Sequence, residues 1–176
     1  MAETSDDLLV ENSLAGDLGA FKALVLRHEG KVAGVVRSML GATPEAEDVG
    51  QEVFIRFYET LSKFRGESSV STYLIRIAIN LSLNEIKKRK RRFFIFTKEE
   101  AGLRLGLTDD HMDMIEMIKY EFSQLDPEFR AVATLRLVEG YSTKETADIL
   151  NIPLGTVLSR LMRAQKQLRT GLEKHL

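Results

Sequence analysis

Between residues 72 and 92 the sequence carries polar side chains whose types and spacing suit contact with a nucleic acid. They recur every three or four positions, so a helix would place them on one face: Arg76, Asn80, Asn84, Lys87 and Arg91. Amide and guanidinium groups can hydrogen-bond to base edges, and the basic side chains near the end of the helix can neutralise phosphates. A basic face that contacts only water is the alternative interpretation.

Two aromatic residues flank the start of this helix and suggest how unpaired bases could be held. Phe64 precedes the loop GESSVS at residues 66–71, and Tyr73 lies in the first turn that follows. Stacking faces beside a basic groove are a common means of binding single-stranded nucleic acid. Both rings could instead belong to the core, which is the more frequent role of an aromatic residue at helical spacing.

The segment YSTKETADILNIPLGTVLSRLMRAQKQLR, residues 141–169, predicts a helix-turn-helix. Ser142 and Glu145 have the spacing of a capping box, so a short helix should run from about Thr143 to Leu150. Asn151 tolerates the left-handed conformation that a tight turn demands. A second helix follows, whose apolar side is formed by Val157, Leu161, Ala164 and Leu168.

The other side of this second helix carries hydroxyl and basic groups that could read DNA. These groups belong to Thr156, Ser159, Arg160, Arg163 and Lys166. The second helix of a helix-turn-helix enters the major groove, where arginine can bind guanine or phosphate and hydroxyls can serve either contact. A helical hairpin whose basic face meets water would show the same pattern.

A helix predicted to start at Pro44 presents a possible protein-binding face. Proline suits the first helical position, where its missing N–H has no partner to lose. One stripe of this helix combines acidic and amide side chains with an apolar one: Asp48, Gln51, Glu52 and Ile55. Acids around an exposed isoleucine suggest a partner with a basic, partly apolar surface, and a solvated helix face is the alternative.

The sequence DDHMD, residues 109–113, raises a different class of function. Oxygen ligands from Asp109, Asp110 and Asp113, together with His111, could hold a divalent ion in a metal-dependent nuclease. Acidic residues also favour a helix N-terminus, and no second carboxylate cluster supports a catalytic site. We therefore expect no catalytic residue, no metal and no cofactor.

The periodic segments favour helix almost throughout, which predicts an all-α protein of two small helical domains joined by a linker. Apolar residues recur at helical spacing from Phe21 to Met39, and Gly41 marks a stop. The pattern weakens after the basic run KKRKRR. The predicted boundaries are residues 1–92 for the first domain, 93–111 for the linker and 112–176 for the second domain. In the second domain an apolar stripe is expected from Phe129, Val132, Leu135 and Val138.

Composition narrows the class of protein further. The 176 residues are 44% hydrophobic and 29% charged, as in a soluble globular protein rather than a disordered one. No stretch is apolar for long enough to span a membrane, and the N-terminus MAETSDDLL is acidic where a secretory signal would be basic. The absence of cysteine fits a cytoplasmic protein. The net charge of −1 conceals basic patches at 87–92 and near the C-terminus, which need an anionic partner or open solvent.

Two long segments resemble the bacterial sigma factors of the extracytoplasmic-function (ECF) group of the sigma-70 family. The segment AEDVGQEVFIRFYETLSKFRGESSVSTYLIRIAINLSLNEIKKRKRR, residues 46–92, is similar to region 2 of that family. The segment LDPEFRAVATLRLVEGYSTKETADILNIPLGTVLSRLMRAQKQL, residues 125–168, is similar to region 4. The resemblance implies a transcription initiation factor, not an enzyme, that joins core RNA polymerase and directs it to promoters.

The resemblance also implies roles for residues of the first domain. The expected contacts with the clamp helices of the largest polymerase subunit are Asp48, Gln51, Glu52, Phe54 and Ile55. The residues expected to open and read the −10 element are Phe64, Arg65, Ser69, Tyr73, Arg76, Asn80, Asn84, Lys87 and Arg91. Taking a base out of the stack costs a few kcal/mol, which stacking and a fitted pocket offset.

For the second domain the resemblance implies a reader of the −35 duplex. The expected DNA contacts are Arg136, Thr143, Thr156, Ser159, Arg160, Arg163 and Lys166. The flap region of the polymerase is the implied protein partner, the linker would thread the polymerase, and many relatives are held inactive by an anti-sigma factor. Because the polymerase would tether both domains, neither needs to bind DNA tightly by itself.

Three residues depart from the family pattern. Leu158 stands where lysine or arginine is usual, so a phosphate or base contact in the −35 element is expected to be missing. Tyr73 replaces the usual tryptophan, and Thr146 occupies a position that is normally aliphatic. A helix-turn-helix regulator that acts without polymerase is the alternative function, and it would leave the segment AEDVGQEVF and the Asn–Arg stripe unused.

Overall fold

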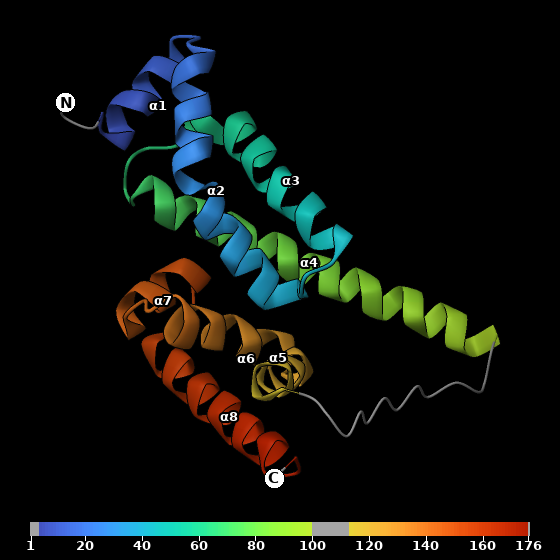
Figure 1. Ribbon diagram of the computed structural model, residues 1–176. Coiled ribbons are helices and arrows are strands. Elements are labelled where there is room, and N and C mark those ends of the chain that lie inside the picture. The colour runs from blue at the N-terminus through green and yellow to red at the C-terminus, as the bar shows by residue number, and fades with distance from the viewer. Residues whose placement is uncertain (1–3, 100–112, 176) are drawn as a thin grey trace.

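The computed structural model describes residues 4–99 and 113–175, which form helices and connections without a strand (Figure 1). The helices of the N-terminal module, residues 4–99, are α1 (Asp6–Leu14), α2 (Leu18–Leu40), α3 (Pro44–Thr60), the 3-10 turn η1 (Leu61–Lys63) and α4 (Val70–Glu99). The helices of the C-terminal module, residues 113–175, are α5 (Met114–Gln124), α6 (Pro127–Ala133), the π-helical turn η2 (Thr134–Val138), α7 (Thr143–Leu150) and α8 (Leu154–Leu172). The predicted all-α fold is confirmed.

Capping groups set several helix boundaries where the sequence predicted them. The side chain of Thr43 accepts a hydrogen bond from the N–H of Ala46 and so caps α3. Ser142 and Glu145 form the predicted capping box of α7, and Asn151 ends that helix in the left-handed conformation, with φ of 51°. Helix α7 therefore begins where local chemistry satisfies its free N–H groups, whereas α8 begins after Pro153 without a side-chain cap.

Helix α1 was not predicted from the sequence, because its apolar residues show no clear helical period. Ser5 caps it, and Asp6 in its first turn accepts a hydrogen bond from Arg27 of α2 at 2.6 Å. Asp6 also lies 2.8 Å from the Nε2 atom of His28. Tertiary contacts with α2 thus position this helix.

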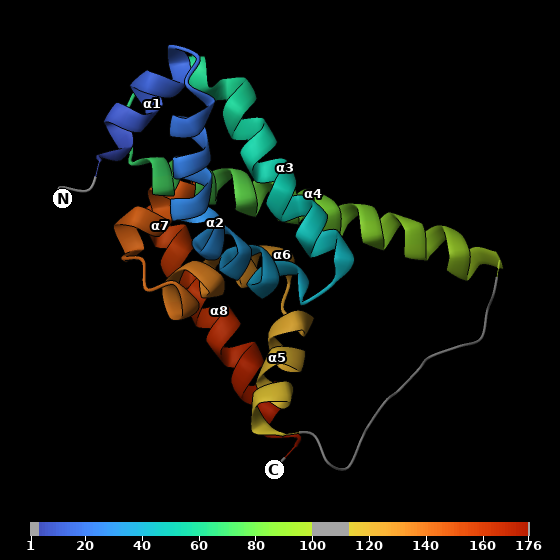
Figure 2. The same ribbon diagram turned by 45° about the horizontal axis from the view of Figure 1, so that its top comes forward.

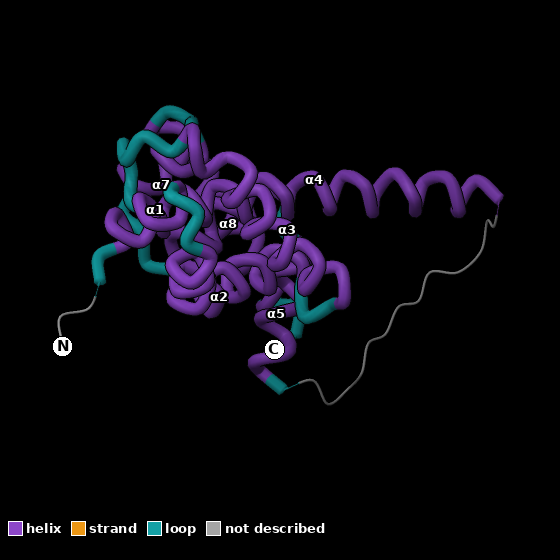
Figure 3. Tube along the Cα trace, turned by 90° about the horizontal axis from the view of Figure 1, so that it is seen from above, coloured by secondary structure: helices purple, strands orange, loops and turns teal. Residues whose placement is uncertain are grey.

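Helix α4 is longer than predicted. It was expected to end at Arg92, yet it continues to Glu99, so the first part of the predicted linker is helical. The reason is that α4 contains neither glycine nor proline over its whole length. Residues 100–111 of the predicted linker lie outside the described residues. The second half of α4 projects away from the other helices (Figures 2 and 3).

The N-terminal module is organised around the buried ring of Phe57 on α3. Its side chain is fully buried, as are those of Leu24 on α2 and Leu74 on α4. The ring centroid of Phe57 lies 6.0 Å from that of Phe21 and 6.2 Å from that of Phe64. The core therefore lies between α2, α3 and α4, and it fixes the loop that leads from Phe64 into α4.

The π-helical turn η2 changes which side chains of the C-terminal module are buried. Val132 and Leu135 are buried as predicted, but Val138 is 55% exposed and does not belong to the buried side of this segment. A π-helical turn holds more residues than an α-helical one and so shifts the register. Thr134 is buried instead, and its Oγ1 atom lies 3.6 Å from the sulfur of Met39 on α2.

The two modules pack directly against each other. One apolar cluster combines residues of α2, α3 and α4 with Ala131, Leu135, Tyr141 and Ile149 of the C-terminal module. The ammonium group of Lys31 on α2 lies 4.7 Å from the centre of the Tyr141 ring. Arg130 of α6 donates a hydrogen bond to the carbonyl of Met39, near the end of α2, at 2.7 Å. Burial lowers the pKa of Arg130, and the nearby charge of Arg89 lowers it further.

Candidate nucleic-acid interface

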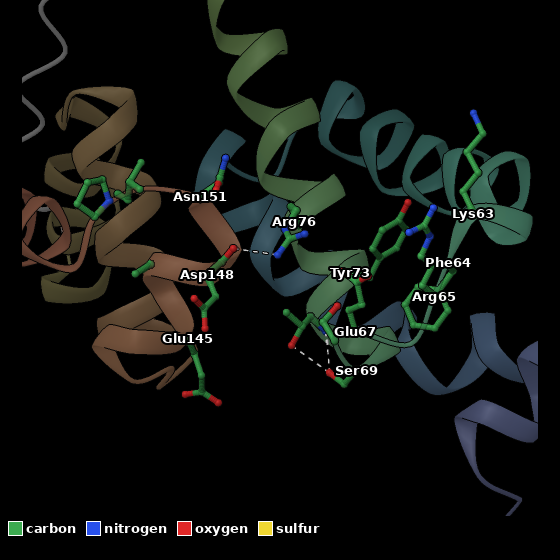
Figure 4. Close-up of a pocket in the computed structure, with 15 residues that line it drawn as sticks. Lys63, Phe64, Arg65, Glu67, Ser69, Tyr73, Arg76, Glu145, Asp148 and Asn151 are labelled. Carbon is green, nitrogen blue, oxygen red and sulfur yellow. Dashed lines mark hydrogen bonds between the residues drawn. The ribbon is translucent and has the colours of Figure 1, made fainter.

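A cavity of about 980 Å³ opens between the loop before α4 and the C-terminal end of α7 (Figure 4). The wall from the N-terminal module includes Lys63 and five residues expected to contact the −10 element: Phe64, Arg65, Ser69, Tyr73 and Arg76. The facing wall includes Glu145, Asp148, Asn151 and Pro153 of the helix-turn-helix. The structure thus brings Phe64, Arg65, Ser69, Tyr73 and Arg76 together at one site.

Phe64 and Tyr73 form an aromatic surface that is both part of the core and part of the cavity wall. Their ring centroids are 5.3 Å apart, and Tyr73 lies 5.9 Å from the buried ring of Phe57. The hydroxyl of Tyr73 donates to Oγ1 of Thr60 at 3.2 Å. The core interpretation of these rings is therefore confirmed, and both rings also line the cavity, while their stacking on bases stays a prediction.

Ser69 holds the loop against the start of α4. Its Oγ atom accepts a hydrogen bond from the N–H of Thr72 at 3.1 Å, which is the geometry of an N-terminal cap. Its hydroxyl also lies 3.0 Å from Oγ1 of Thr72 (Figure 4). The side chains of Ser69 and Thr72 therefore fix how the loop joins α4.

Arg76, which was expected to contact DNA, is engaged with the other module (Figure 4). Its Nη2 atom donates to the carbonyl of Asp148 at 2.9 Å, and its Nε atom donates to the carbonyl of Ile149 at 3.3 Å. These carbonyls belong to the last turn of α7, where a positive charge is favoured by the helix dipole. Sequence spacing gave no signal for this contact, because it joins residues from two different modules.

The remaining polar residues of the α4 stripe are solvent-exposed. Asn80, Asn84, Lys87 and Arg91 lie along the helix beyond Arg76. Asn84 lines a separate groove together with Asp48 and Glu52 of α3. The stripe therefore leads from the cavity along the projecting part of α4, with Asn84 bordering the α3 face.

The predicted protein-binding face of α3 borders an apolar cavity of about 610 Å³ between α2 and α3. Gln51, Phe54 and Ile55 line it, and Ile55 is 52% exposed. Asp48 lies exposed nearby, while Glu52 accepts a hydrogen bond from Arg56 at 2.7 Å. The sequence did not reveal the contribution of α2 to this groove, which comes from Val25, Glu29, Val32, Ala33 and Arg37.

Helix α8 presents its polar residues to solvent to different degrees. Ser159, Arg163 and Lys166 are exposed, and Thr156 is half-buried. Arg163 has its guanidinium 5.9 Å from the centre of the Phe129 ring. Arg160 forms an ion pair with Glu128 of α6 at 2.5 Å, so it lies against the body of the module.

Arg136 and Thr143 belong to elements that precede α8. Arg136 belongs to η2 and donates a hydrogen bond to the carbonyl of Tyr141, which holds the loop before α7. Thr143 is the first residue of α7 and is half-buried. Hydrogen bonds from Ser142 lower the pKa of Glu145 in the same turn, so that its carboxylate stays ionised at the rim of the cavity.

The metal site considered from the sequence falls mostly outside the described residues. Asp109, Asp110 and His111 lie outside the described residues, and Asp113 occupies the position before α5. Elsewhere, within residues 4–99 and 113–175, no group of three or more histidine, aspartate or glutamate side chains could hold a metal ion. Within the same ranges, no helix is long and apolar enough to cross a membrane.

Comparison with known families assigns both modules. Residues 24–92 match the family described as Sigma-70 region 2, and residues 115–168 match Sigma-70, region 4. RNA polymerase sigma-H factor of Pseudomonas aeruginosa is 35% identical, with 98% of this chain and 96% of that protein covered. The ECF RNA polymerase sigma factor SigW of Bacillus subtilis is 34% identical, with 89% of this chain and 91% of that protein covered.

This chain belongs to the ECF group of the sigma-70 family. Two solved structures share the fold of this ECF sigma factor. The sigma factor RpoE of Bartonella quintana, solved with the anti-sigma factor NepR, aligns with a TM-score of 0.68 and 22% identity over 87% of this chain and 96% of that chain. CnrH, solved with the cytosolic domain of CnrY, aligns with a TM-score of 0.71 and 23% identity over 96% of this chain and 97% of that chain.

Proposed function

We propose that this ECF sigma factor binds core RNA polymerase and directs it to promoters by contacting DNA at two separated sites. The proposal rests on one observation: the chain has two separate surfaces whose side chains suit contact with DNA. A cavity lined by aromatic, basic and acidic side chains lies at the start of α4, and a helix-turn-helix with an exposed cationic helix lies in α7 and α8. A regulator that acts without polymerase would have no use for the first surface or for the α2–α3 groove.

The cavity at the start of α4 is our candidate for holding unpaired bases of the −10 element. Phe64 and Tyr73 supply ring faces for stacking, and Arg65 and Arg76 supply positive charge. Asn80 and Asn84 are the candidate groups for base edges, and Lys87 and Arg91 for phosphates further along the helix. Each duplex phosphate that is engaged should change the slope of log K against log salt concentration by about −0.9.

The exposed face of α8 is our candidate for reading the −35 duplex. Thr156, Ser159, Arg163 and Lys166 are the residues proposed to reach the major groove or its phosphates. Arg160 can join them once it leaves Glu128, whereas Arg136 and Thr143 are better placed to support the loop before α7 than to read bases. The flap region of the polymerase is the proposed protein partner of this module.

The groove between α2 and α3 is our candidate for docking on the clamp helices of the largest polymerase subunit. Phe54 and Ile55 offer apolar contact, and Asp48, Gln51 and Glu52 offer polar contacts to a basic partner. Exposed carboxylates beside an apolar groove suit a partner surface that is basic and partly apolar.

Four finer statements complete the proposal. The factor acts in the cytoplasm and has no catalytic activity, cofactor or metal of its own. The linker of residues 93–111 threads the polymerase between a region 2 domain, residues 1–92, and a region 4 domain, residues 112–176. An anti-sigma factor is a further proposed partner, since the RpoE protein of Bartonella quintana is bound to one.

A binding experiment with purified core polymerase tests the docking part of this proposal. Wild-type protein should co-elute with core polymerase, and Glu52→Arg should weaken the complex at least tenfold because it places a positive charge against a basic partner. Glu11→Arg, at an exposed position of α1, is the matched control and should bind as the wild type does. A wild-type chain that never binds core polymerase would favour the regulator instead.

A further inference from the structure

The recognition helix α8 carries a stripe of exposed apolar side chains. Leu154, Leu158 and Met162 are spaced four residues apart and are 48%, 48% and 70% exposed. The apolar side of α8 that faces the core is a different one, because Val157 and Ala164 are fully buried. We refer to Leu154, Leu158 and Met162 as the apolar stripe.

Single exposed apolar side chains are normal on protein surfaces, but three on successive turns of one helix edge call for a partner. The chemistry of α8 specifies which kind of partner fits. From Leu154 to Leu172 the sequence contains no acidic residue, and its charged residues are Arg160, Arg163, Lys166 and Arg169. A surface of this charge is complementary to a polyanion, so the stripe lies at the edge of a surface suited to DNA.

Two polar candidates on α8 are already partly engaged within the protein. The hydroxyl of Ser159 donates to the carbonyl of Thr156 at 3.0 Å, and Arg160 is paired with Glu128. These contacts reduce the number of polar groups that are free to read base edges. The apolar stripe therefore makes up a large share of the exposed surface with which the N-terminal half of α8 can contact a ligand.

The position of the stripe matters, because the N-terminal residues of a recognition helix approach the base edges. Leu154 is the first residue of α8, directly after the turn at Asn151 and Pro153. The apolar group that a base pair presents in the major groove is the C5-methyl of thymine. Leucine and methionine side chains at this depth can pack on that methyl and cannot make a polar base contact.

We propose that Leu158, supported by Leu154 and Met162, determines specificity by packing on thymine methyl groups in the −35 duplex. The inference rests on the proposed reading of the −35 element by α8. It replaces the expectation that Leu158 merely removes a contact. An A·T pair is selected at the position that Leu158 faces, where a basic side chain would hold phosphate or guanine.

Deoxyuridine substitution isolates the methyl group, because uracil differs from thymine by that methyl alone. The full chain with core polymerase first selects its preferred −35 sequence from duplexes randomised in that region. Each thymine of the selected sequence is then replaced singly by deoxyuridine, and run-off transcription is measured. We expect at least one replacement to lower transcription about fourfold, which corresponds to the loss of one buried methyl.

Two variants sharpen the test. Leu158→Ala should transcribe equally from the thymine and the deoxyuridine templates at that position. Leu158→Arg should do the same and should show a steeper salt dependence, by about 0.9 in slope if it gains one phosphate. Leu26→Ala, a similarly exposed leucine on α2, is the matched control and should keep the fourfold difference.

The outcomes separate the inference from the function on which it rests. If a scrambled −35 region supports equal transcription, α8 does not read this element and both proposals for it fail. If transcription depends on the −35 sequence but every deoxyuridine template matches its thymine template, the inference about the stripe is overturned and the proposed function stands. A selected element without any A·T pair would also overturn the inference.

Discussion

The two candidate DNA surfaces of this ECF sigma factor differ in how freely they face solvent. The exposed face of α8 carries Arg163 and Lys166 with no helix packed over it in the described part of the chain. At the start of α4, in contrast, Arg76 is hydrogen-bonded to the last turn of α7. A base can approach α8 directly, whereas Arg76 must release two carbonyls before it can contact DNA.

A second arginine–carbonyl hydrogen bond joins the two modules at the end of α2. Arg130 of α6 donates to Met39 at the end of α2, just as Arg76 of α4 donates to the end of α7. Each module therefore supplies an arginine to the C-terminal carbonyls of a helix in the other module, where positive charge is favoured. One candidate DNA surface is therefore built within a module, and the other is shared between the two modules.

The largest effect is expected at Ile149, which lies in the cluster between the modules and is 2% exposed. Ile149→Ala should lower the free energy of unfolding by about 2–5 kcal/mol, because it leaves a cavity in buried packing. Chemical denaturation measures the change, and Ile118→Ala at an exposed position of α5 is the control, with an expected change within about 0.5 kcal/mol. If both variants change the free energy of unfolding by no more than about 0.5 kcal/mol, α7 does not pack on α4 in solution. The candidate surface at the start of α4 would then not be shared between the modules.

Mutations on the exposed face of α8 should weaken DNA binding and should lower the stability of the fold only slightly. Arg163→Ala should reduce transcription that depends on the −35 element by an amount equivalent to about 1–3 kcal/mol if Arg163 reads a base. Its stability should fall by no more than about 1 kcal/mol, since the contact with Phe129 is exposed. Lys174→Ala, beyond the end of α8, serves as the control for a lost surface charge. An Arg163 variant that transcribes normally would remove this residue from the reading surface.

The shared surface should respond in both measurements. Arg76→Ala removes two hydrogen bonds to backbone carbonyls and should cost about 1–2 kcal/mol of stability, besides weakening promoter opening. Asn80→Ala is the matched variant on the same helix face, exposed to solvent, and should weaken promoter opening without a change in stability. Equal stability of both variants would show that Arg76 is as free as Asn80.

The smallest effect, and the one gain, is expected at Thr146 of α7. Its side chain is fully buried, and its hydroxyl has no hydrogen-bond partner among the described residues. Thr146→Val keeps the shape and removes the unsatisfied hydroxyl, so unfolding should require about 1 kcal/mol more. Urea denaturation of the two proteins side by side is the measurement. A destabilised valine variant would mean that the hydroxyl has a partner, and the packing of α7 would need revision.

The sequence predicted those structural features that depend on neighbouring residues within a single helix or turn. The capping box at Ser142, the turn at Asn151 and the helix start at Pro44 all follow from the chemistry of neighbouring residues. The buried side of α2 likewise follows from the helical spacing between Phe21 and Met39, and Leu24 and Met39 are fully buried.

What could not be predicted depends on contacts between distant residues. The exposure of Val138 results from a π-helical turn, and helix α1 is held by Asp6 against Arg27 and His28. The engagement of Arg76 joins residues more than seventy positions apart, for which no spacing rule exists. The sequence therefore identified the residues of the candidate sites better than it identified their partners.

Transcription in vitro tests the central claim most directly. The purified chain and core RNA polymerase are mixed with a library of duplexes that carry random sequence upstream of a transcribed tag. The account predicts RNA with defined start sites, from templates enriched at two separated positions, with Asn80→Ala and Arg163→Ala each weakening selection at a different one. Failure of the folded wild-type chain to start RNA synthesis at any defined site would contradict the account.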